Sequence, residues 1–204
     1  MFERHSALAG ALTLGGRDGT DGQRRLRIGE ARGWGLVQIA AFTTALTELE
    51  SAVRPVLNAE LPKRIGEVVN VEGRRLLKTG SEQYWIIMTD GDDVARRLLD
   101  AVNPAIGAVT LLSHSRTCIF IEGAAVRGLL AAAIPLDFHP DVFDVGQFAL
   151  TGLHHTPVLI HRSGHNRFEI FVMRTFARSV WEWFTDAALS MGYEVVAPPA
   201  VGSA

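Results

Sequence analysis

The chain of 204 residues is poor in cysteine, in long apolar runs and in excess charge of either sign. Its one cysteine, Cys118, excludes an intramolecular disulfide and a cysteine-based metal cluster, and it fits a reducing, cytoplasmic compartment. No run reaches the ~18 to 20 apolar residues of a membrane helix, and the start of the chain lacks a signal-peptide pattern. With a net charge of −2, the chain lacks the excess of lysine and arginine that is typical of nucleic-acid-binding proteins. We therefore expect a cytoplasmic protein that binds neither nucleic acid nor a membrane.

Motifs that mark catalytic and cofactor sites are also missing. The chain has no phosphate-cradling G-x-x-x-x-G-K-[ST], no G-x-S-x-G nucleophile elbow and no H-E-x-x-H metal pair. Gly33 and Gly35 precede an apolar strand candidate instead of following one, so they cannot place a pyrophosphate at a helix start. Cys118 lies within another apolar strand candidate, where a small buried side chain is its ordinary role. The sequence therefore predicts no catalytic, cofactor-binding or metal-binding residue in this chain.

Four of the seven histidines fall within twelve residues, and neutral imidazoles are common metal ligands. They are His154, His155, His161 and His165. Strand alternation would send His154 and His155 to opposite faces, while His161 and His165 flank an apparent turn at 162–164. No metal-ligand spacing and no cysteine partner accompanies them. We therefore favour an exposed hairpin tip over a metal site.

The remaining composition is that of a globular protein, with 48% apolar and 21% charged residues. Periodicity predicts strands over 34–40, 67–71, 74–78, 83–88, 108–112, 117–121, 147–153, 157–161, 168–173 and 193–196. It predicts helices that start at Thr43 or Thr44 and run to 57, and over 94–102, 124–133 and 175–191, with threonine caps at the first and at Thr175. Helices thus alternate with groups of strands. The expected class is α+β, with antiparallel sheets and helices from two pseudo-repeated split β-α-β halves.

The domain organisation follows from where glycine gathers and where periodicity begins. Residues 1–33 hold much of the glycine and little apolar surface, so we expect an extended N-terminal arm. Residues 34–196 are expected to form a single α+β domain, with halves over about 34–104 and 105–196. A Pro-Pro tail over 197–204 ends the chain.

A proline-bounded loop follows the third predicted helix and contains Asp137 and His139. These two side chains resemble an acid–base pair, but no nucleophile, metal set or cofactor motif supports one. The alternative is that they hydrogen-bond the loop backbone and hold its shape, in a connector suited to packing or partner contact. The residues proposed for that role are Pro135, Asp137, Phe138, His139 and Pro140.

Two tryptophans on the last predicted helix cannot both face one core. Trp181 and Trp183 lie roughly 200° apart around a helix axis, so one is expected to meet the sheet and the other to lie near a surface. An exposed tryptophan on a helix is a suitable interface anchor, or is covered by the C-terminal tail. Trp181 therefore joins the loop as a candidate for partner contact or a structural role, and we include Arg174 and Phe176, a few residues before it, in the same set of candidates.

A series of short segments matches one family in order along nearly the whole chain. The most specific is the segment PLDFHP at 135–140, with Phe143, Gly146 and Thr151 behind it. The others lie at 6–10, 35–39, 80–87, 113–117, 121–125, 174–177 and 181–183. The series resembles the gamma subunit family of heterotetrameric sarcosine oxidase.

That resemblance implies a fold similar to the folate-binding domain of aminomethyltransferases. It implies a gamma subunit without a cofactor of its own, in contact with alpha, beta and delta subunits, and with alpha most directly. FAD, FMN, NAD and tetrahydrofolate are expected on the partner subunits. The implied function is support of the oxidative demethylation of sarcosine to glycine, with the one-carbon unit passed to tetrahydrofolate.

Two departures from the family pattern leave the substrate open. Ile134 stands where the family leads us to expect cysteine, and the histidine-rich region over 154–165 is unusual. One alternative is a subunit of a related N-methyl amino acid dehydrogenase. Another is a free-standing folate-binding one-carbon protein.

Overall fold

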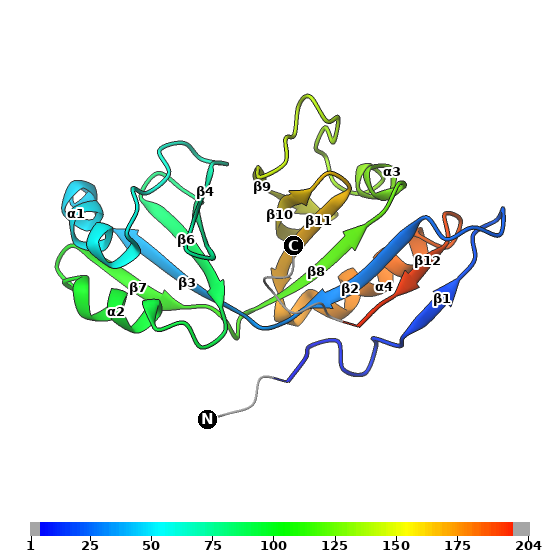
Figure 1. Ribbon diagram of the computed structural model, residues 1–204, viewed down its shortest axis with the longest axis horizontal. Coiled ribbons are helices and arrows are strands. Elements are labelled where there is room, and N and C mark those ends of the chain that lie inside the picture. Colours follow the sequence, from blue (N-terminus) through cyan, green and yellow to red (C-terminus); the bar gives the residue numbers. More distant parts are fainter. Residues whose placement is uncertain (1–4, 198–204) are drawn as a thin grey trace. The chain divides into compact units, whose positions relative to one another are not determined.

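The computed structural model describes residues 5–197, which divide into two compact units (Figure 1). Unit 1 contains residues 5–32 and 114–197, and unit 2 contains residues 33–113. Apart from Ala197, the predicted tail lies outside the described residues, as do residues 1–4 of the predicted arm. Within the described part of the chain, no helix has both the length and the apolar character needed to cross a membrane.

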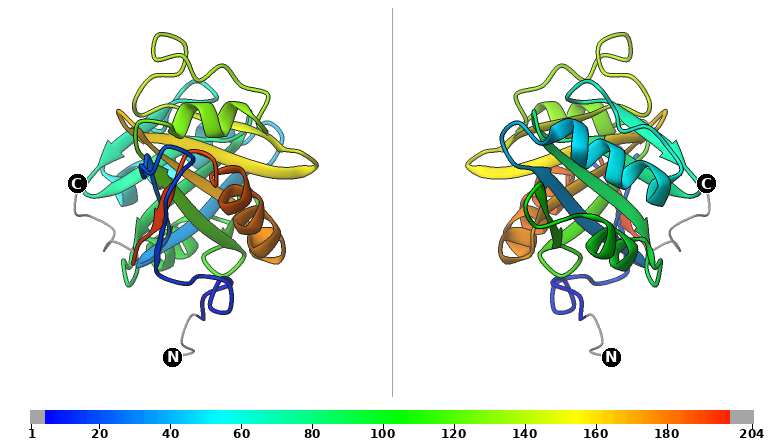
Figure 2. Two further views of the ribbon diagram at one scale, coloured as in Figure 1. Left: turned by 90° about the vertical axis from the view of Figure 1, so that its right-hand side faces the viewer. Right: turned by 90° about the vertical axis from the view of Figure 1, so that its left-hand side faces the viewer.

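Unit 2 is a five-stranded antiparallel sheet with two helices on one face. Its elements are β3 (Trp34–Ala41), α1 (Leu46–Leu57), β4 (Val68–Val71), β5 (Arg74–Lys78), β6 (Gln83–Thr89), α2 (Val94–Ala101) and β7 (Gly107–Leu111). The strand order is β4-β5-β6-β3-β7. The right-hand view of Figure 2 shows α1 and α2 on the same side of this sheet.

The core of unit 2 follows from the two periodicities of its sequence. Alternate residues of β3 and β6 point to the helices, so that Val37 lies opposite Ile86 in the sheet and both are fully buried. Leu49 and Val53 supply the buried stripe of α1 at helical spacing. The predicted threonine cap of α1 is wrong: Ala45 is the N-cap, and it makes no side-chain capping hydrogen bond.

Unit 1 is a seven-stranded sheet with two helices on one face (Figure 2, left). Its elements are β1 (Gly15–Arg17), β2 (Leu26–Ala31), β8 (Arg116–Glu122), α3 (Val126–Ala131), β9 (Phe148–Leu153), β10 (Thr156–Gly164), β11 (Arg167–Met173), a 3₁₀ turn η1 (Arg174–Phe176), α4 (Ala177–Ala187) and β12 (Tyr193–Val195). The order is β1-β12-β2-β8-β11-β10-β9. Every neighbouring pair is antiparallel except β12 and β2. Phe176 takes the N-cap position of α4, so the predicted Thr175 cap is also wrong.

The prediction of an extended arm over residues 1–33 is wrong, because β2 lies in the middle of the unit 1 sheet between β12 and β8. Leu26 and Ile28 are buried in its core. The glycines misled the prediction, since here they permit close packing. A Cβ on Gly29 would come within 2.6 Å of the Phe120 ring, so only glycine lets the ring lie against this strand.

The pseudo-repeat is present, but the two halves meet between β7 and β8 and not near residue 105. Both units contain the series β-α-β-β-β-α-β, which is β3 to β7 in unit 2 and β8 to β12 in unit 1. The strand predicted over 108–112 therefore closes the first half, because it pairs with β3. In unit 1, β2 occupies the place beside β8 that β7 occupies beside β3. Consequently β12 is displaced by one position and pairs in parallel with β2.

One partly buried ion pair joins two elements of unit 2. Arg74 on β5 donates two hydrogen bonds to Asp92, of 2.7 and 3.0 Å, and Asp92 also accepts the Val94 amide at the start of α2. Burial raises the pKa of Asp92, but the hydrogen bonds from Arg74 and Val94 and the charges of Arg74 and Arg97 outweigh it. The pKa therefore lies below its ordinary value of 3.8.

Arg74→Met should lower the free energy of unfolding by about 2 kcal/mol at neutral pH, because it leaves a largely buried carboxylate without its partner. A lowered native pKa gives stability that is present above the unfolded value and is lost as pH falls through the native value. The difference in unfolding free energy between Arg74→Met and wild type should therefore be smaller in acid than at neutral pH. Urea unfolding at neutral pH and at about pH 3 measures it. Arg96→Met, at a 75% exposed arginine, is the control, and an equal loss in both variants would contradict the prediction.

Candidate functional site

The candidate site is the loop of unit 1 between α3 and β9, residues 132–147, called the 132–147 loop from here (Figure 1). It begins where α3 ends, because Pro135 has no amide hydrogen to continue the helix and restricts the residue before it. Ile134 is buried, and its amide donates to the Leu130 carbonyl at 3.0 Å. The start of the loop is thereby fixed to the helix and to the core.

Asp137 and His139 hold the backbone of the loop. The His139 amide donates to Asp137 Oδ1 at 2.8 Å, and the Asp141 amide donates to His139 Nδ1 at 3.3 Å. The His139 carbonyl accepts the amides of Val142 and Phe143, each at 3.0 Å. Both side chains thus act as acceptors for local backbone groups, which is the shape-holding role that the sequence suggested.

Two phenylalanines of the loop attach it to the sheet. Phe138 and Phe143 are buried, and both rings pack on Phe168 of β11, at centroid distances of 5.6 and 6.3 Å. The two loop rings also meet each other edge to face at 6.1 Å. Such pairs contribute about 0.5 to 1.5 kcal/mol each beyond the area they bury. The loop is therefore an ordered part of the unit 1 core at two points.

A buried arginine lies beneath the loop, and sequence reasoning missed it. Arg162 on β10 is 2% exposed, and its guanidinium donates to the carbonyls of Pro140, Phe143 and His165. Its own amide donates to the Gln147 carbonyl at 2.9 Å, and its carbonyl accepts the Gly146 amide at 2.8 Å.

The expected solvated turn at 162–164 is wrong, because β10 continues to Gly164. The signal for this was present in the strand pattern. Val158 and Ile160 face the unit 1 core, so the next alternate position, Arg162, faces it too.

The four clustered histidines of the sequence do not share one exposed hairpin tip, so that expectation is wrong. His161 is buried in β10 opposite Glu169, with 3.6 Å between Nδ1 and Oε2. His154 lies in the turn between β9 and β10, and its ring meets the Trp183 ring at 5.2 Å. His165 is exposed. Over residues 5–197, no three histidine, cysteine, aspartate or glutamate side chains gather in a way that could hold a metal ion.

The other candidate residues, Arg174, Phe176 and Trp181, do not lie on one common surface. Phe176 in η1 is 42% exposed, next to the exposed Met173, and Arg174 is half-buried with its amide on the Ser115 carbonyl at 2.9 Å. Trp181, by contrast, is only 3% exposed and belongs to the unit 1 core. The expectation that one of the two tryptophans meets the sheet is confirmed, and the half-buried one is Trp183.

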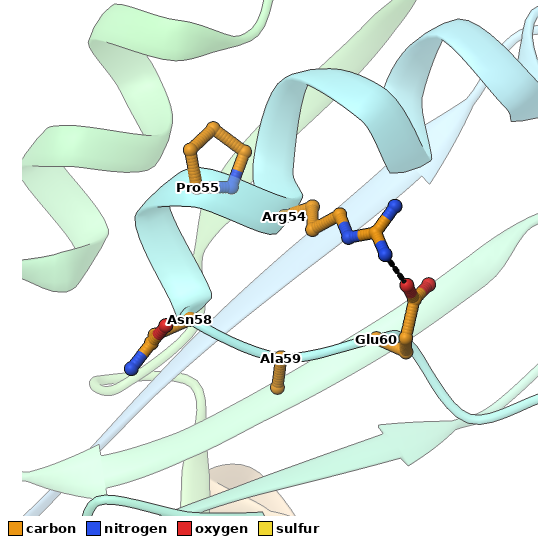
Figure 3. Close-up of a pocket in the computed structure, with 5 residues that line it drawn as sticks. All are labelled: Arg54, Pro55, Asn58, Ala59 and Glu60. Atoms are coloured by element: carbon orange, nitrogen blue, oxygen red, sulfur yellow. Dashed lines mark ion pairs between the residues drawn. The ribbon is translucent and has the colours of Figure 1, made fainter.

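A pocket in unit 2 lies at the C-terminal end of α1 (Figure 3). It is lined by Arg54, Pro55, Asn58, Ala59 and Glu60. Arg54 and Glu60 form an ion pair, and both side chains are mostly exposed, so the pair contributes little to stability. The charged groups of this pocket therefore neutralise each other, and its lining offers no nucleophile.

The architecture defines the class of protein. Glycine cleavage system aminomethyltransferase T from Bartonella henselae, a solved structure, superposes with a TM-score of 0.63 over 85% of this chain and 48% of that one. Its identity of 16% shows the fold alone. The chain is thus an α+β protein, as its periodicity predicted, with an aminomethyltransferase-like fold, as the family resemblance implied.

The particular family follows from the sequence comparisons. The model described as "Sarcosine oxidase, gamma subunit family" matches residues 41–190. A relative described as sarcosine oxidase subunit gamma, from Corynebacterium sp. (strain P-1), is 30% identical over 148 residues, which are 72% of this chain and 73% of the relative. The chain belongs to the sarcosine oxidase gamma subunit family.

Two further relatives agree with this assignment. Sarcosine oxidase subunit gamma from Arthrobacter sp. is 29% identical over 72% of this chain and 73% of its own length. The solved heterotetrameric sarcosine oxidase from Corynebacterium sp. U-96, in complex with pyrrole 2-carboxylate, contains a chain with a TM-score of 0.76 and 26% identity. That match covers 92% of this chain and 96% of the other.

Proposed function

We propose that this chain is a non-catalytic gamma subunit of a heterotetrameric sarcosine oxidase-type complex. In that complex it supports the oxidative demethylation of sarcosine to glycine, with the one-carbon unit passed to tetrahydrofolate. The observation that carries the proposal is the match to a chain of a solved sarcosine oxidase heterotetramer over nearly the full length of both chains. The chain also belongs to the corresponding subunit family.

The proposal assigns the chemistry to other subunits. FAD, FMN, NAD and tetrahydrofolate would bind to the partner alpha and beta subunits, and alpha would be the most direct neighbour of this chain. The single cysteine, Cys118, is buried and suits a cytoplasmic setting. On this chain, the exposed part of the 132–147 loop and the Met173–Phe176 surface are the proposed contact regions, since both present apolar side chains to solvent.

The structure supports a structural role for the remaining candidate residues. Phe138 packs inside the loop and Trp181 packs in the core, so neither side chain offers area to a partner. Asp137 and His139 use their acceptor atoms on the loop backbone. Pro135 and Pro140 bound the loop, and the Pro140 carbonyl is held by Arg162. These residues would shape the contact surface without forming its centre.

Co-expression with the sarcosine-oxidase-type chains of its own organism tests the proposal. A tagged copy of this chain should retain larger chains that carry flavin absorbance, whereas the chain purified alone should be colourless. Elution of the tagged chain as a separate species, with the larger chains in another fraction, would refute the proposal.

A folate titration separates the proposed subunit from a free-standing folate-binding protein. The four tryptophans of the chain provide the intrinsic fluorescence signal. Tetrahydrofolate added to the isolated chain at millimolar concentration should produce no saturable change. A saturable change would support the free-standing protein instead.

A further inference from the structure

The tip of the 132–147 loop, residues 141–145, presents apolar side chains to solvent. Val142 is 58% exposed and Val145 is 52% exposed, while Phe143 between them is buried. The loop projects beyond the strands of its own sheet (Figures 1 and 2). The two valines are thus presented together on one short projection.

The 132–147 loop itself carries acidic side chains and no lysine or arginine. No lysine or arginine occurs from residue 128 to residue 161, whereas Asp137, Asp141 and Asp144 all fall in that stretch. Within the described part of the chain, none of these three aspartates forms an ion pair with a lysine or an arginine. The Asp141 side chain is 88% exposed. The tip therefore combines two exposed valines with aspartates whose nearest basic side chain in an ion pair is His139, with its Nδ1 3.7 Å from Asp141 Oδ2.

The tip is also ordered from beneath. The guanidinium of Arg162 donates to the carbonyl of Pro140, just before the tip, and to that of Phe143, within it. A turn closes its far side, where the Asp144 amide donates to Gln147 Oε1 at 2.8 Å and the Gln147 amide donates to the Asp144 carbonyl at 3.1 Å. A surface that is already ordered loses little conformational entropy on binding.

We propose that residues 141–145 are a preformed docking tip for a neighbouring subunit of the complex, which rests on the proposed function. The partner surface is an apolar depression with lysine or arginine side chains at its rim. Val142 and Val145 enter the depression, and Asp141 and Asp144 pair with the basic rim. The opposite charges assist association and set orientation, and the buried valines slow dissociation.

Release of the chain from the assembled complex tests the tip. The complex is prepared with a fluorescently labelled copy of the chain, and dissociation is followed after excess unlabelled wild-type chain is added. The V142S/V145S chain should dissociate from the complex at least about tenfold faster than wild type, because serine gains less than valine from burial in an apolar surface. D141N/D144N should leave faster than wild type at low salt, with the difference narrowing as salt is raised.

Two exposed positions outside the loop serve as controls, and the outcomes separate the two proposals. Leu189→Ser and Asp186→Asn should leave at the wild-type rate. If wild type assembles and both tip variants leave at its rate, the docking tip is refuted and the proposed function stands. If wild type does not assemble, both proposals are refuted. A dimer of the isolated chain that depends on the tip, with release from the complex unchanged, would also refute the docking tip. In that case the tip would bind a second copy of this chain and not a neighbouring subunit.

Discussion

Arg162→Leu should free the 132–147 loop and lower the free energy of unfolding by about 3 kcal/mol. The guanidinium donates hydrogen bonds to three carbonyls, of Pro140, Phe143 and His165, and leucine can replace none of them. The bond to the Phe143 carbonyl is buried and the other two are partly buried, and a buried acceptor that loses its donor costs about 1 to 3 kcal/mol. Removal of a buried charge recovers part of that loss, because an arginine in the core is itself costly to desolvate.

Denaturant unfolding measures the loss, and limited proteolysis shows where it arises. Arg127→Leu is the matched control, because Arg127 is half-buried and binds Asn166 and His165 without contacting the 132–147 loop. We expect cleavage within the loop in Arg162→Leu and resistance in the control. A variant as stable as wild type, with an uncleaved loop, would show that the loop is ordered without Arg162.

Trp181→Ala should lower the free energy of unfolding by about 3 to 5 kcal/mol, and Trp183→Ala by only about 1 kcal/mol. Trp181 is almost fully buried in the unit 1 core, where alanine leaves a large cavity. Trp183 lies two residues further along α4, is half-buried, and contacts His154 and Phe184 at its edge. The two substitutions delete the same side chain from one helix, so the difference reports burial alone.

Urea unfolding of both variants, with α4 content checked by circular dichroism, measures this difference. Equal losses would mean that both rings contribute the same buried area, in contradiction with the structure. A larger loss at Trp183 would place that ring in the core.

Periodicity predicted most elements of the fold because the driving force is burial of one face. The strand over 74–78 has the predicted bounds, and α2 starts at the predicted Val94. Helix ends were less predictable, since the threonines near α1 and α4 make no capping bond. The position of β2 was missed because strand pairing between distant segments leaves no local signal, while the glycines that permit it resemble a loop.

The sequence predicted an ordered loop at the candidate site but not the contacts that lie beneath it. Proline positions and local acceptors indicated an ordered loop at 135–140, and its hydrogen bonds follow that expectation. Arg162 lies 22 residues beyond Pro140, and only the folded hairpin of β9 and β10 brings it beneath the loop. The buried state of His161 likewise depends on β10 being longer than its apolar run. Such contacts follow from tertiary structure and are not encoded in short windows.

Native mass spectrometry of the complex captured through this chain tests the central claim most directly. The account predicts one copy of this chain together with one each of the alpha, beta and delta subunits, with flavin mass carried only by the larger chains. A captured species that contains this chain alone, or this chain with its own bound cofactor, would contradict the account.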